Sequence, residues 1–340
     1  MLEERDLDES EWTRYKQLEV ELDKFWRMKD IKIRQSSRDR DILEGDRNTT
    51  YFHAVANYRS RKKRSDYLES PIGHVSDQKG MMNIAVGFYK DLFACEDRGD
   101  IRLSDDFWEE SQKVSREEND FLVAPFSEEE IKEAIFNCYP EGVPGPDGLS
   151  FLFYQKFWDT IKKDVLAMFA DFYKGELDIY RLNFALVTLV PKFNDACNMK
   201  QFRPVSLLNC SFKMFSKLLT NRLGSAFIKG RYILESVVVA HEIVHSLHES
   251  KDKGVVLKLD YEKAYDRASW EFLFKVLETR GFSTKWTQWI KQLVTGGSLG
   301  ILVNGEESPY FKPGKGLRQG DPLSPLLFNL VGDAFFQNAR

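Results

Sequence analysis

LKLDYEKAYD, at residues 257–266, and GLRQGDPLSP, at residues 316–325, are the two stretches that decide how this 340-residue chain folds. The first begins as an apolar run that ends on Asp260, which is typical of a short buried strand with a carboxylate at its end. The second is a glycine-containing loop that enters a helix, because Ser324 suits an N-cap and Pro325 suits the first helical position. The sequence thus predicts polar groups at a strand end and a helix start.

These positions suit phosphate chemistry. A carboxylate at a strand end, such as Asp260, can bind a hard cation such as Mg²⁺, and two-metal phosphoryl transfer needs several such carboxylates. Arg318 and Gln319 offer hydrogen-bond donors beside a helix start, which favours anions. The alternative reading is an ordinary strand turn and an ordinary loop-to-helix entry.

Outward from these stretches, strands and helices are mixed without a regular βαβ repeat, so the predicted fold class is α+β. Predicted strands cover residues 184–190 and 255–259, and a hairpin from Leu299 to Phe311 turns at Asn304-Gly305. Ser269 is expected to cap one helix and Gly281 to end it. Predicted helices cover residues 151–173, 212–223 (with Arg222 on the polar side), 237–248, 270–280, 285–294 and 324–338, besides an amphipathic helix that starts at Trp12.

The two stretches together resemble motifs of reverse transcriptases from LINE-type (non-LTR) retrotransposons, especially those of plants. Further segments resemble this family in the family's order: EGDRNTTYFHAVANYRSRKKR (44–64), PGPDGLSFLFYQKFWDTI (144–161), LVTLVPKFNDACNMKQFRPVSLLNCSFKMFSKLLTNRL (186–223) and SAFIKGRYILESVVVAHEIVHSL (225–247). The resemblance covers nearly the whole chain from about residue 26. It implies a right-hand polymerase with fingers and an incomplete palm, which copies an RNA template onto a DNA primer from dNTPs with Mg²⁺.

The resemblance also implies roles for single residues. Asp260 is the first catalytic aspartate and a Mg²⁺ ligand, with Tyr261 adding its backbone carbonyl. Tyr265 lies beneath the incoming sugar and selects against a 2′-hydroxyl. Lys192 and Arg203 hold the triphosphate, for which arginine suits through paired hydrogen bonds. The residues of the second stretch that contact nucleotide and template are Arg318, Gln319 and Gly320.

The sequence departs from the family pattern in two places. The family's Tyr/Phe-x-Asp-Asp motif does not occur in the 340 residues, and the adjacent pair Asp105-Asp106 lies in an acidic segment far upstream. The connector near Leu223–Ser225 is shorter than in the family, with Gly224 in place of its usual glutamine. We therefore expect a truncated fragment, without the endonuclease domain of the family and inactive as a polymerase on its own.

The net charge of −4 hides an uneven distribution. Residues 26–64 carry 12 basic and 5 acidic groups, and residues 131–340 carry 27 and 22, with an acidic segment at 96–130 between them. Basic and aromatic residues interleaved near position 60 can hold phosphates and stack bases, although a solvated helix end or a nuclear-import patch has the same composition. We call this group the basic cluster: Arg59, Arg61, Lys62, Lys63 and Arg64. A non-catalytic nucleic-acid-binding remnant is therefore the alternative function.

A remote alternative is a zinc peptidase, because His241-Glu-Ile-Val-His245 is an HExxH sequence. On a helix both histidines share a face and Glu242 could act as a base, but a third ligand is required. The extension that would supply this ligand is missing, and His248 follows only three residues later. The pentapeptide also falls inside the stretch that resembles the polymerase family.

The predicted organisation is a helical, basic linker region at residues 1–130 and a reverse transcriptase domain at residues 131–340, with residues 96–130 as linker or surface helices. No apolar run approaches the roughly 18 residues of a membrane helix, and the acidic start is no signal peptide. The four cysteines show no CxxC spacing. The expected location is nuclear or cytoplasmic, not secreted, with no membrane partner.

Overall fold

The computed structural model describes residues 12–22, 64–71, 73–95, 103–104, 107–227, 242, 245–246, 249 and 262–337. The chain divides into two compact units, residues 1–66 with 141–143 and residues 67–140 with 144–340. In the first unit, residues 12–22 are helical, as predicted, and large apolar side chains along them are exposed. Trp12 and Tyr15 stack there with 5.6 Å between ring centroids, since residues three apart are neighbours on a helix.

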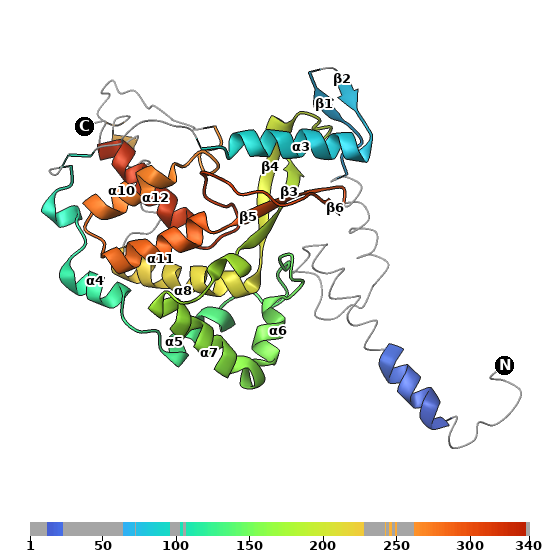
Figure 1. Ribbon diagram of the computed structural model, residues 1–340, viewed down its shortest axis with the longest axis horizontal. Helices are drawn as coiled ribbons and strands as arrows, with labels where there is room; N and C mark the ends of the chain where they lie inside the picture. The colour runs from blue at the N-terminus through green and yellow to red at the C-terminus, as the bar shows by residue number, and fades with distance from the viewer. Residues whose placement is uncertain are drawn as a thin grey trace, which may run out of the picture. The chain divides into compact units, whose positions relative to one another are not determined.

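The second unit contains a four-stranded sheet in the order β4-β3-β5-β6 (Figure 1). Its strands are β3 (Phe184–Pro191), β4 (Phe202–Leu208), β5 (Ser298–Val303) and β6 (Glu306–Glu307), and a separate antiparallel pair consists of β1 (Leu68–Ser70) and β2 (Gly73–Val75). β3 runs antiparallel to β4 and parallel to β5. The predicted strand at 184–190 and the predicted hairpin that turns at Asn304-Gly305 are both confirmed.

The helices cover most of the remaining described residues. The α-helices are α3 (Gln78–Leu92), α4 (Arg116–Leu122), α5 (Glu128–Phe136), α6 (Phe151–Lys156), α7 (Trp158–Lys174), α8 (Cys210–Phe227), α10 (Trp270–Thr279), α11 (Thr284–Thr295) and α12 (Ser324–Gln337), and short 3-10 helices span Glu110–Gln112, Ile179–Arg181 and Met199–Gln201. α8, α10, α11 and α12 confirm four predicted helices. The predicted helix at 151–173 is instead interrupted at Phe157. The sequence did not indicate this break, because the aromatic pattern continues through Phe157.

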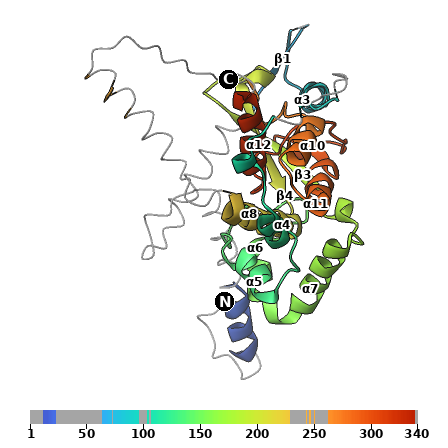
Figure 2. The ribbon, with the colours of Figure 1, turned by 90° about the vertical axis from the view of Figure 1, so that its left-hand side faces the viewer.

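Short polar side chains set where helices start. The Ser269 hydroxyl accepts a hydrogen bond from the Phe272 N–H at 3.3 Å, as predicted, and Ser283 caps α11 in the same way. α10 ends next to Gly281, whose φ of +84° reverses the chain, which also agrees with the prediction. α10 then packs against both α11 and α12 (Figure 2).

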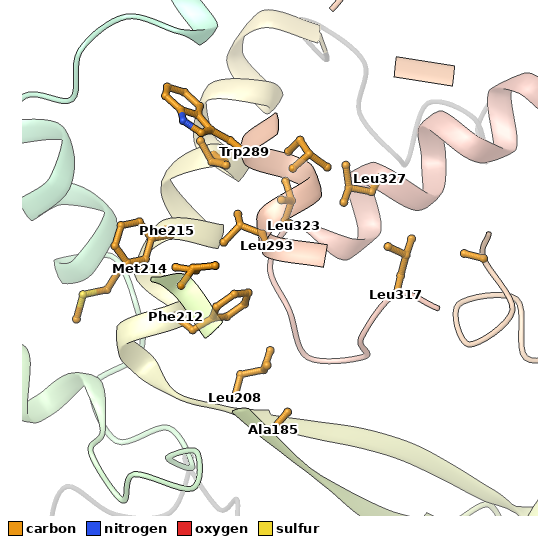
Figure 3. Close-up of a cluster of buried hydrophobic side chains, with 14 of the residues drawn as sticks. Ala185, Leu208, Phe212, Met214, Phe215, Trp289, Leu293, Leu317, Leu323 and Leu327 are labelled. Carbon is orange, nitrogen blue, oxygen red and sulfur yellow. The ribbon is translucent and has the colours of Figure 1, made fainter. Parts of the chain in front are cut away.

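Aromatic side chains fill the core between α7, α8 and α11. The Phe215 ring lies 4.3 Å from Phe169 and 4.9 Å from Phe172, and Phe172 stacks on Trp289 at 5.6 Å. Figure 3 shows Phe212 and Phe215 of α8 within a cluster that reaches Leu323 of the loop-to-helix stretch. The helix start predicted from the sequence is therefore anchored in the main core.

Arg222 of α8 does not lie on a polar face, as expected from the sequence, but is buried. Its Nε and Nη2 donate to the two carboxylate oxygens of Glu130 at 2.6 and 2.7 Å. Its Nη1 donates to the backbone carbonyls of Leu122 and Ala124 at 2.9 and 2.7 Å. The paired geometry satisfies the buried charge and fastens α8 to α5 and to the end of α4.

The described part of the acidic segment before residue 130 packs into the second unit and includes the helix α4. Trp108, Val114 and Leu122 are buried, and the guanidinium of Arg280 lies 4.6 Å from the Trp108 ring. The N–H of Val114 donates to the Arg280 carbonyl at 2.9 Å. Isolated apolar residues between acidic ones thus reach the core, and contacts divide the chain near residue 66, while the boundary at residue 130 stays a prediction.

Candidate functional site

The loop before α10 and the loop before α12 lie against each other through their backbones. The N–H of Gly316 donates to the Ala268 carbonyl at 2.8 Å, and the N–H of Leu317 donates to the Tyr265 carbonyl at 2.7 Å. The indole N–H of Trp270 adds a bond to the Gly316 carbonyl at 2.7 Å. The described end of the first stretch and the loop of the second stretch are thus bonded to each other, although about 50 residues separate them in the sequence.

Two glycines make this close packing possible. Gly316 has a φ of +98°, and a Cβ there would lie 2.8 Å from the carbonyl oxygen of Asp266. Gly320 has a φ of +113°, and a Cβ there would lie 2.6 Å from the carbonyl oxygen of Ser206. On the β4 side, the Ser206 N–H donates to the Gln319 carbonyl at 2.8 Å. The loop is therefore held on two sides, with its Gln319 backbone fixed.

A buried carboxylate lies at the centre of this arrangement. Asp266 is only 2% exposed, and its N- and C-terminal neighbours in the chain belong to the loop that is bonded to Gly316 and Leu317. Its Oδ2 has no hydrogen-bond partner among the described residues. Burial raises the pKa of Asp266 to about 6, against the opposing effects of Lys263, Gln319 and Lys192. Sequence reasoning gave this residue no role, because a buried carboxylate looks like any other charged residue in the sequence.

Lys263 and Tyr89 complete the surroundings of Asp266. The Lys263 ammonium lies 3.9 Å from the centroid of the Phe88 ring on α3, and it has no hydrogen-bond partner within the described part of the chain. Burial lowers the pKa of Lys263 to about 8, although the Asp266 carboxylate opposes the change. Burial also raises the pKa of the Tyr89 hydroxyl, and Asp266 adds to this effect. Asp266 and Lys263 are thus charged groups that are partly removed from water, and the aromatic rings of Phe88 and Tyr89 lie beside Lys263.

The ring of Tyr265, predicted to lie beneath the sugar, stacks on Phe328 of α12. Their centroids are 4.6 Å apart and their planes differ by 18°. Because the Tyr265 carbonyl is bonded to Leu317 as well, both ends of this residue are fixed by the second stretch. The half-buried ring therefore offers a rigid aromatic surface next to Asp266 in the chain.

Lys192 and Arg203, the predicted triphosphate pair, lie on the β3–β4 hairpin. Arg203 is paired with Val190, which is two residues before Lys192, so strand alternation places both cationic residues on one face. Both are exposed, and the Lys192 ammonium donates to the Lys200 carbonyl at 2.9 Å. The bond from the Ser206 N–H on β4 to the Gln319 carbonyl links this hairpin to the loop before α12.

Arg318 lies apart from this group, in the interior. Its guanidinium donates to the Asn183 side chain and to the Leu293 carbonyl at 3.0 Å, and it lies 3.7 Å from the Asp321 carboxylate. It also covers the Phe212 ring at 4.5 Å. Its side chain is only 11% exposed, and burial lowers its pKa. The geometry thus gives Arg318 a role in packing, whereas Gly320 is exposed beside Gln319.

A cavity of about 250 Å³ opens beside Lys263. Four basic side chains line it, from both loops and from the β3–β4 connection: Lys200, Lys263, Arg267 and Lys315. Asp91 and Glu262 contribute opposite charges. The balance is positive, which suits an anionic ligand.

Several predicted site residues lie outside the described residues. These are Asp260, Tyr261, Arg59, Arg61, Lys62 and Lys63, whereas Arg64 is described and exposed. Of the HExxH sequence, Glu242 and His245 are helical and exposed, while His241 is not described. The described residues contain no group of three acidic, histidine or cysteine side chains that could hold a metal ion, and none of their helices is long and apolar enough to cross a membrane.

Comparison with known families gives a match over the second half of the chain. Residues 190–340 match the family model described as "Reverse transcriptase (RNA-dependent DNA polymerase)". The matched region includes Lys192, Arg203, Tyr265 and Gln319, and thus the whole group around Asp266 except α3.

Similar proteins extend the match beyond this region. The chain is 28% identical over 312 residues to the "Transposon TX1 uncharacterized 149 kDa protein" of Xenopus laevis, which covers 88% of this chain and 24% of that protein. It is 28% identical over 224 residues to the "Retrovirus-related Pol polyprotein from type-1 retrotransposable element R2" of Nasonia vitripennis, covering 63% and 21%. The corresponding type-2 element R2DM of Drosophila melanogaster is 25% identical over 199 residues, covering 56% and 18%. The chain spans about a quarter or less of the length of these relatives.

Proposed function

We propose that the chain carries a reverse transcriptase domain of the non-LTR retrotransposon type, and that it binds an RNA template, a DNA primer and a dNTP for RNA-directed DNA synthesis. One observation carries the proposal. The N–H of Leu317 donates to the Tyr265 carbonyl, and the N–H of Ser206 on β4 donates to the Gln319 carbonyl, while Lys192 follows β3, the strand that pairs with β4. Three predicted nucleotide contacts thereby belong to one group.

We further propose that residues 131–340 are the fingers and part of the palm, preceded by a linker region at 1–130. The β3–β4 hairpin with Lys192 and Arg203 would belong to the fingers. The loop at 262–269 and the loop before α12 would belong to the palm. The backbone bonds between these two loops support this assignment, because they keep the predicted sugar and base contacts at a fixed spacing. The basic cluster would hold RNA, in the nucleus or the cytoplasm.

The proposed reaction is attack of the primer 3′-hydroxyl on the α-phosphate of the dNTP. Lys192 and Arg203 would neutralise the triphosphate, and the Tyr265 ring, held by Phe328, would leave no room for a 2′-hydroxyl. Reverse transcriptases generally use divalent ions, which lower the charge of the reacting phosphate. By resemblance, Asp260 and Tyr261 would hold Mg²⁺, and both lie outside the described residues.

Equilibrium binding to the full 340-residue chain tests this function. The chain should bind an RNA template annealed to a dideoxy-terminated DNA primer, and should then bind the complementary dNTP more tightly than the other three. Lys192→Ala should weaken dNTP binding about tenfold, through loss of one charge-assisted contact. The matched control Lys162→Ala removes an exposed lysine of α7 that pairs with Glu128 at 3.2 Å, and should leave dNTP binding unchanged. Absence of dNTP binding to the loaded chain would overturn the proposal.

Primer extension then separates catalysis from binding alone. With an unblocked primer and Mg²⁺, we expect binding with little or no extension, because no Tyr/Phe-x-Asp-Asp sequence occurs in these 340 residues. Robust extension that is abolished by Asp260→Ala would contradict the expected inactivity and show that the ligand set is complete. Binding of nucleic acid without any selection of the complementary dNTP would favour the non-catalytic alternative.

A further inference from the structure

We propose that the cavity beside Lys263 is a binding site for a compact anion of the pyrophosphate class. The cavity has a volume of about 250 Å³ and lies between α3, the loop before α10, the loop before α12 and Lys200 of the β3–β4 connection. Lys192 and Arg203, the predicted triphosphate pair, do not line it. The proposal therefore concerns other residues, and it does not rest on the proposed function.

The cations that line the cavity are not neutralised by their neighbours. Lys200, Lys263 and Arg267 form no ion pair with any of the described residues. This holds although two carboxylates, Asp91 and Glu262, line the same cavity. With four basic and two acidic side chains, the lining carries a net charge of +2, which attracts an anion.

Lys263 is held at the cavity at a cost in free energy. Its φ of +53° lies in the left-handed region, which residues with a side chain rarely adopt. Its ammonium is buried without a hydrogen-bond partner in the described part of the chain, and it lies over the Phe88 ring. An ammonium can donate three hydrogen bonds, so an anion in the cavity would supply the missing acceptors. A strained backbone that carries an unpartnered cation is typical of a ligand site.

Backbone hydrogen bonds hold the walls of the cavity in place. The N–H of Gly314, next to Lys315, donates to the carbonyl of Phe93 at the end of α3, at 2.7 Å. In the loop before α10, the N–H of Arg267 donates to the Lys263 carbonyl at 3.0 Å. This loop is bonded in turn to the loop before α12, as described above. The lining cations are therefore brought together before a ligand arrives, which lowers the entropic cost of binding.

The size and the lining of the cavity indicate the class of ligand. Its volume lies below the roughly 300–1,000 Å³ of pockets that enclose a drug-sized molecule, so a whole nucleotide does not fit well. The lining contains one aromatic ring, Phe88, and the Lys263 ammonium already lies over it, which leaves little to stack on a base. Cations from several segments suit an anion with charge on many oxygens, through charge-assisted hydrogen bonds. Pyrophosphate has these properties.

Calorimetric titration of the full 340-residue chain with inorganic pyrophosphate, in metal-free buffer at low salt, tests the proposal. We expect saturable binding that Arg267→Gln and Lys200→Gln each weaken about three- to tenfold, through loss of one charge-assisted contact. Both side chains are exposed, so the substitutions should leave the fold intact. The matched control Arg181→Gln removes the same charge from an exposed arginine that pairs with Asp178 at 3.2 Å, and should leave pyrophosphate affinity unchanged.

Asp91→Asn provides a test with the opposite sign. The substitution removes an exposed carboxylate from the lining, so pyrophosphate should bind about threefold more tightly. Damage to the fold would instead weaken binding, and thermal unfolding of each variant identifies such damage.

Absence of pyrophosphate binding would overturn the proposal, as would equal losses in Arg267→Gln and Arg181→Gln. Unchanged affinity in both cavity variants would mean that the anion binds elsewhere, which overturns the proposal as well. Because the titration contains no nucleic acid and no dNTP, its outcome is separate from that of the dNTP-binding test. A chain that binds pyrophosphate in the cavity but no dNTP would contradict the proposed function alone, and the converse result would contradict the cavity site alone.

Discussion

At the scale of single residues, the two buried charged side chains of Arg318 and Asp266 differ in how well their partners compensate them. Arg318 has its guanidinium bonded to Asn183, Leu293 and Asp321, and it is well compensated in the interior. Asp266 has one oxygen without a partner in the described structure. Both residues lie in the quoted stretches, and only the partners distinguish them. A sequence cannot show partners, so the resemblance placed Arg318 at the nucleotide and gave Asp266 no role.

The first prediction follows from the pKa of Asp266, which burial raises from the ordinary value of 3.8 to about 6 in the folded chain. A raised carboxyl pKa stabilises the protein below pH 3.8, and this contribution is lost as the pH rises through about 6. Asp266→Asn should therefore match the wild type in free energy of unfolding near pH 4 and exceed it near pH 7.5. The gain should be on the order of 3 kcal/mol, from about two pKa units. Urea unfolding at both pH values measures it, and a pH-independent difference would contradict the assignment.

The second prediction concerns Arg318, whose removal would leave Asp321 buried without its cation. Arg318→Ala should lower the free energy of unfolding by about 3–5 kcal/mol, as expected for a broken buried ion pair. The comparison variant is Arg181→Ala, whose side chain is 84% exposed and pairs with Asp178 at 3.2 Å, and which should change stability by less than about 1 kcal/mol. Denaturant unfolding distinguishes them. Equal, small effects would mean that Arg318 is free for the nucleotide contact that the resemblance implies.

At the scale of elements, the sequence predicted the helices and strands whose hydrophobic pattern and end signals lie within their own residues. β3 is a continuous apolar run and α10 has a serine cap and a terminal glycine, so both were found. β4 was missed because Pro204 and Ser206 interrupt its apolar pattern. Proline is tolerated there because β4 is the edge strand of the sheet that the described residues form, which only the sheet order reveals. α3 was missed because Gly80 and Gly87 weaken the helical signal.

The third prediction tests the contact between β4 and the loop before α12. Gly320→Ala forces a side chain into a φ of +113° and places its Cβ 2.6 Å from the Ser206 carbonyl oxygen. The free energy of unfolding should fall by about 1–3 kcal/mol, and dNTP affinity should fall with it because the Gln319 backbone shifts. Gly87→Ala in α3 is the matched substitution, with no atom near the new Cβ, and it should stabilise the chain by about 0.5–1 kcal/mol. Parallel melting curves compare the two, and a neutral Gly320→Ala would contradict the close packing.

At the scale of the whole molecule, the charge counts showed which segments are positive, but they did not show where the second compact unit begins. The second unit takes in residues 67–130, whose few buried apolar residues are too sparse to form a pattern. The candidate site depends on contacts between β4, the loop at 262–269 and the loop before α12, and such contacts between distant segments have no signature in a single sequence. The resemblance supplied three of its members, and geometry supplied Asp266 and Lys263.

The last prediction addresses the uneven charge of the whole chain. Each phosphate neutralised on single-stranded RNA contributes about 0.7 to the slope of log affinity against log salt. Replacing the five residues of the basic cluster by glutamine should therefore reduce the magnitude of this slope by up to about 3.5, and should weaken RNA binding most at low salt. The control removes five basic residues elsewhere, from α5, α7 and the segment after them: Lys132, Lys162, Lys163, Lys174 and Arg181. Both variants carry the same net charge. A larger change of slope in the first variant would therefore be due to phosphate contacts of the basic cluster and not to the net charge of the chain. Equal slopes would show that the basic cluster has no phosphate contacts of its own, and that RNA binding depends on other parts of the chain.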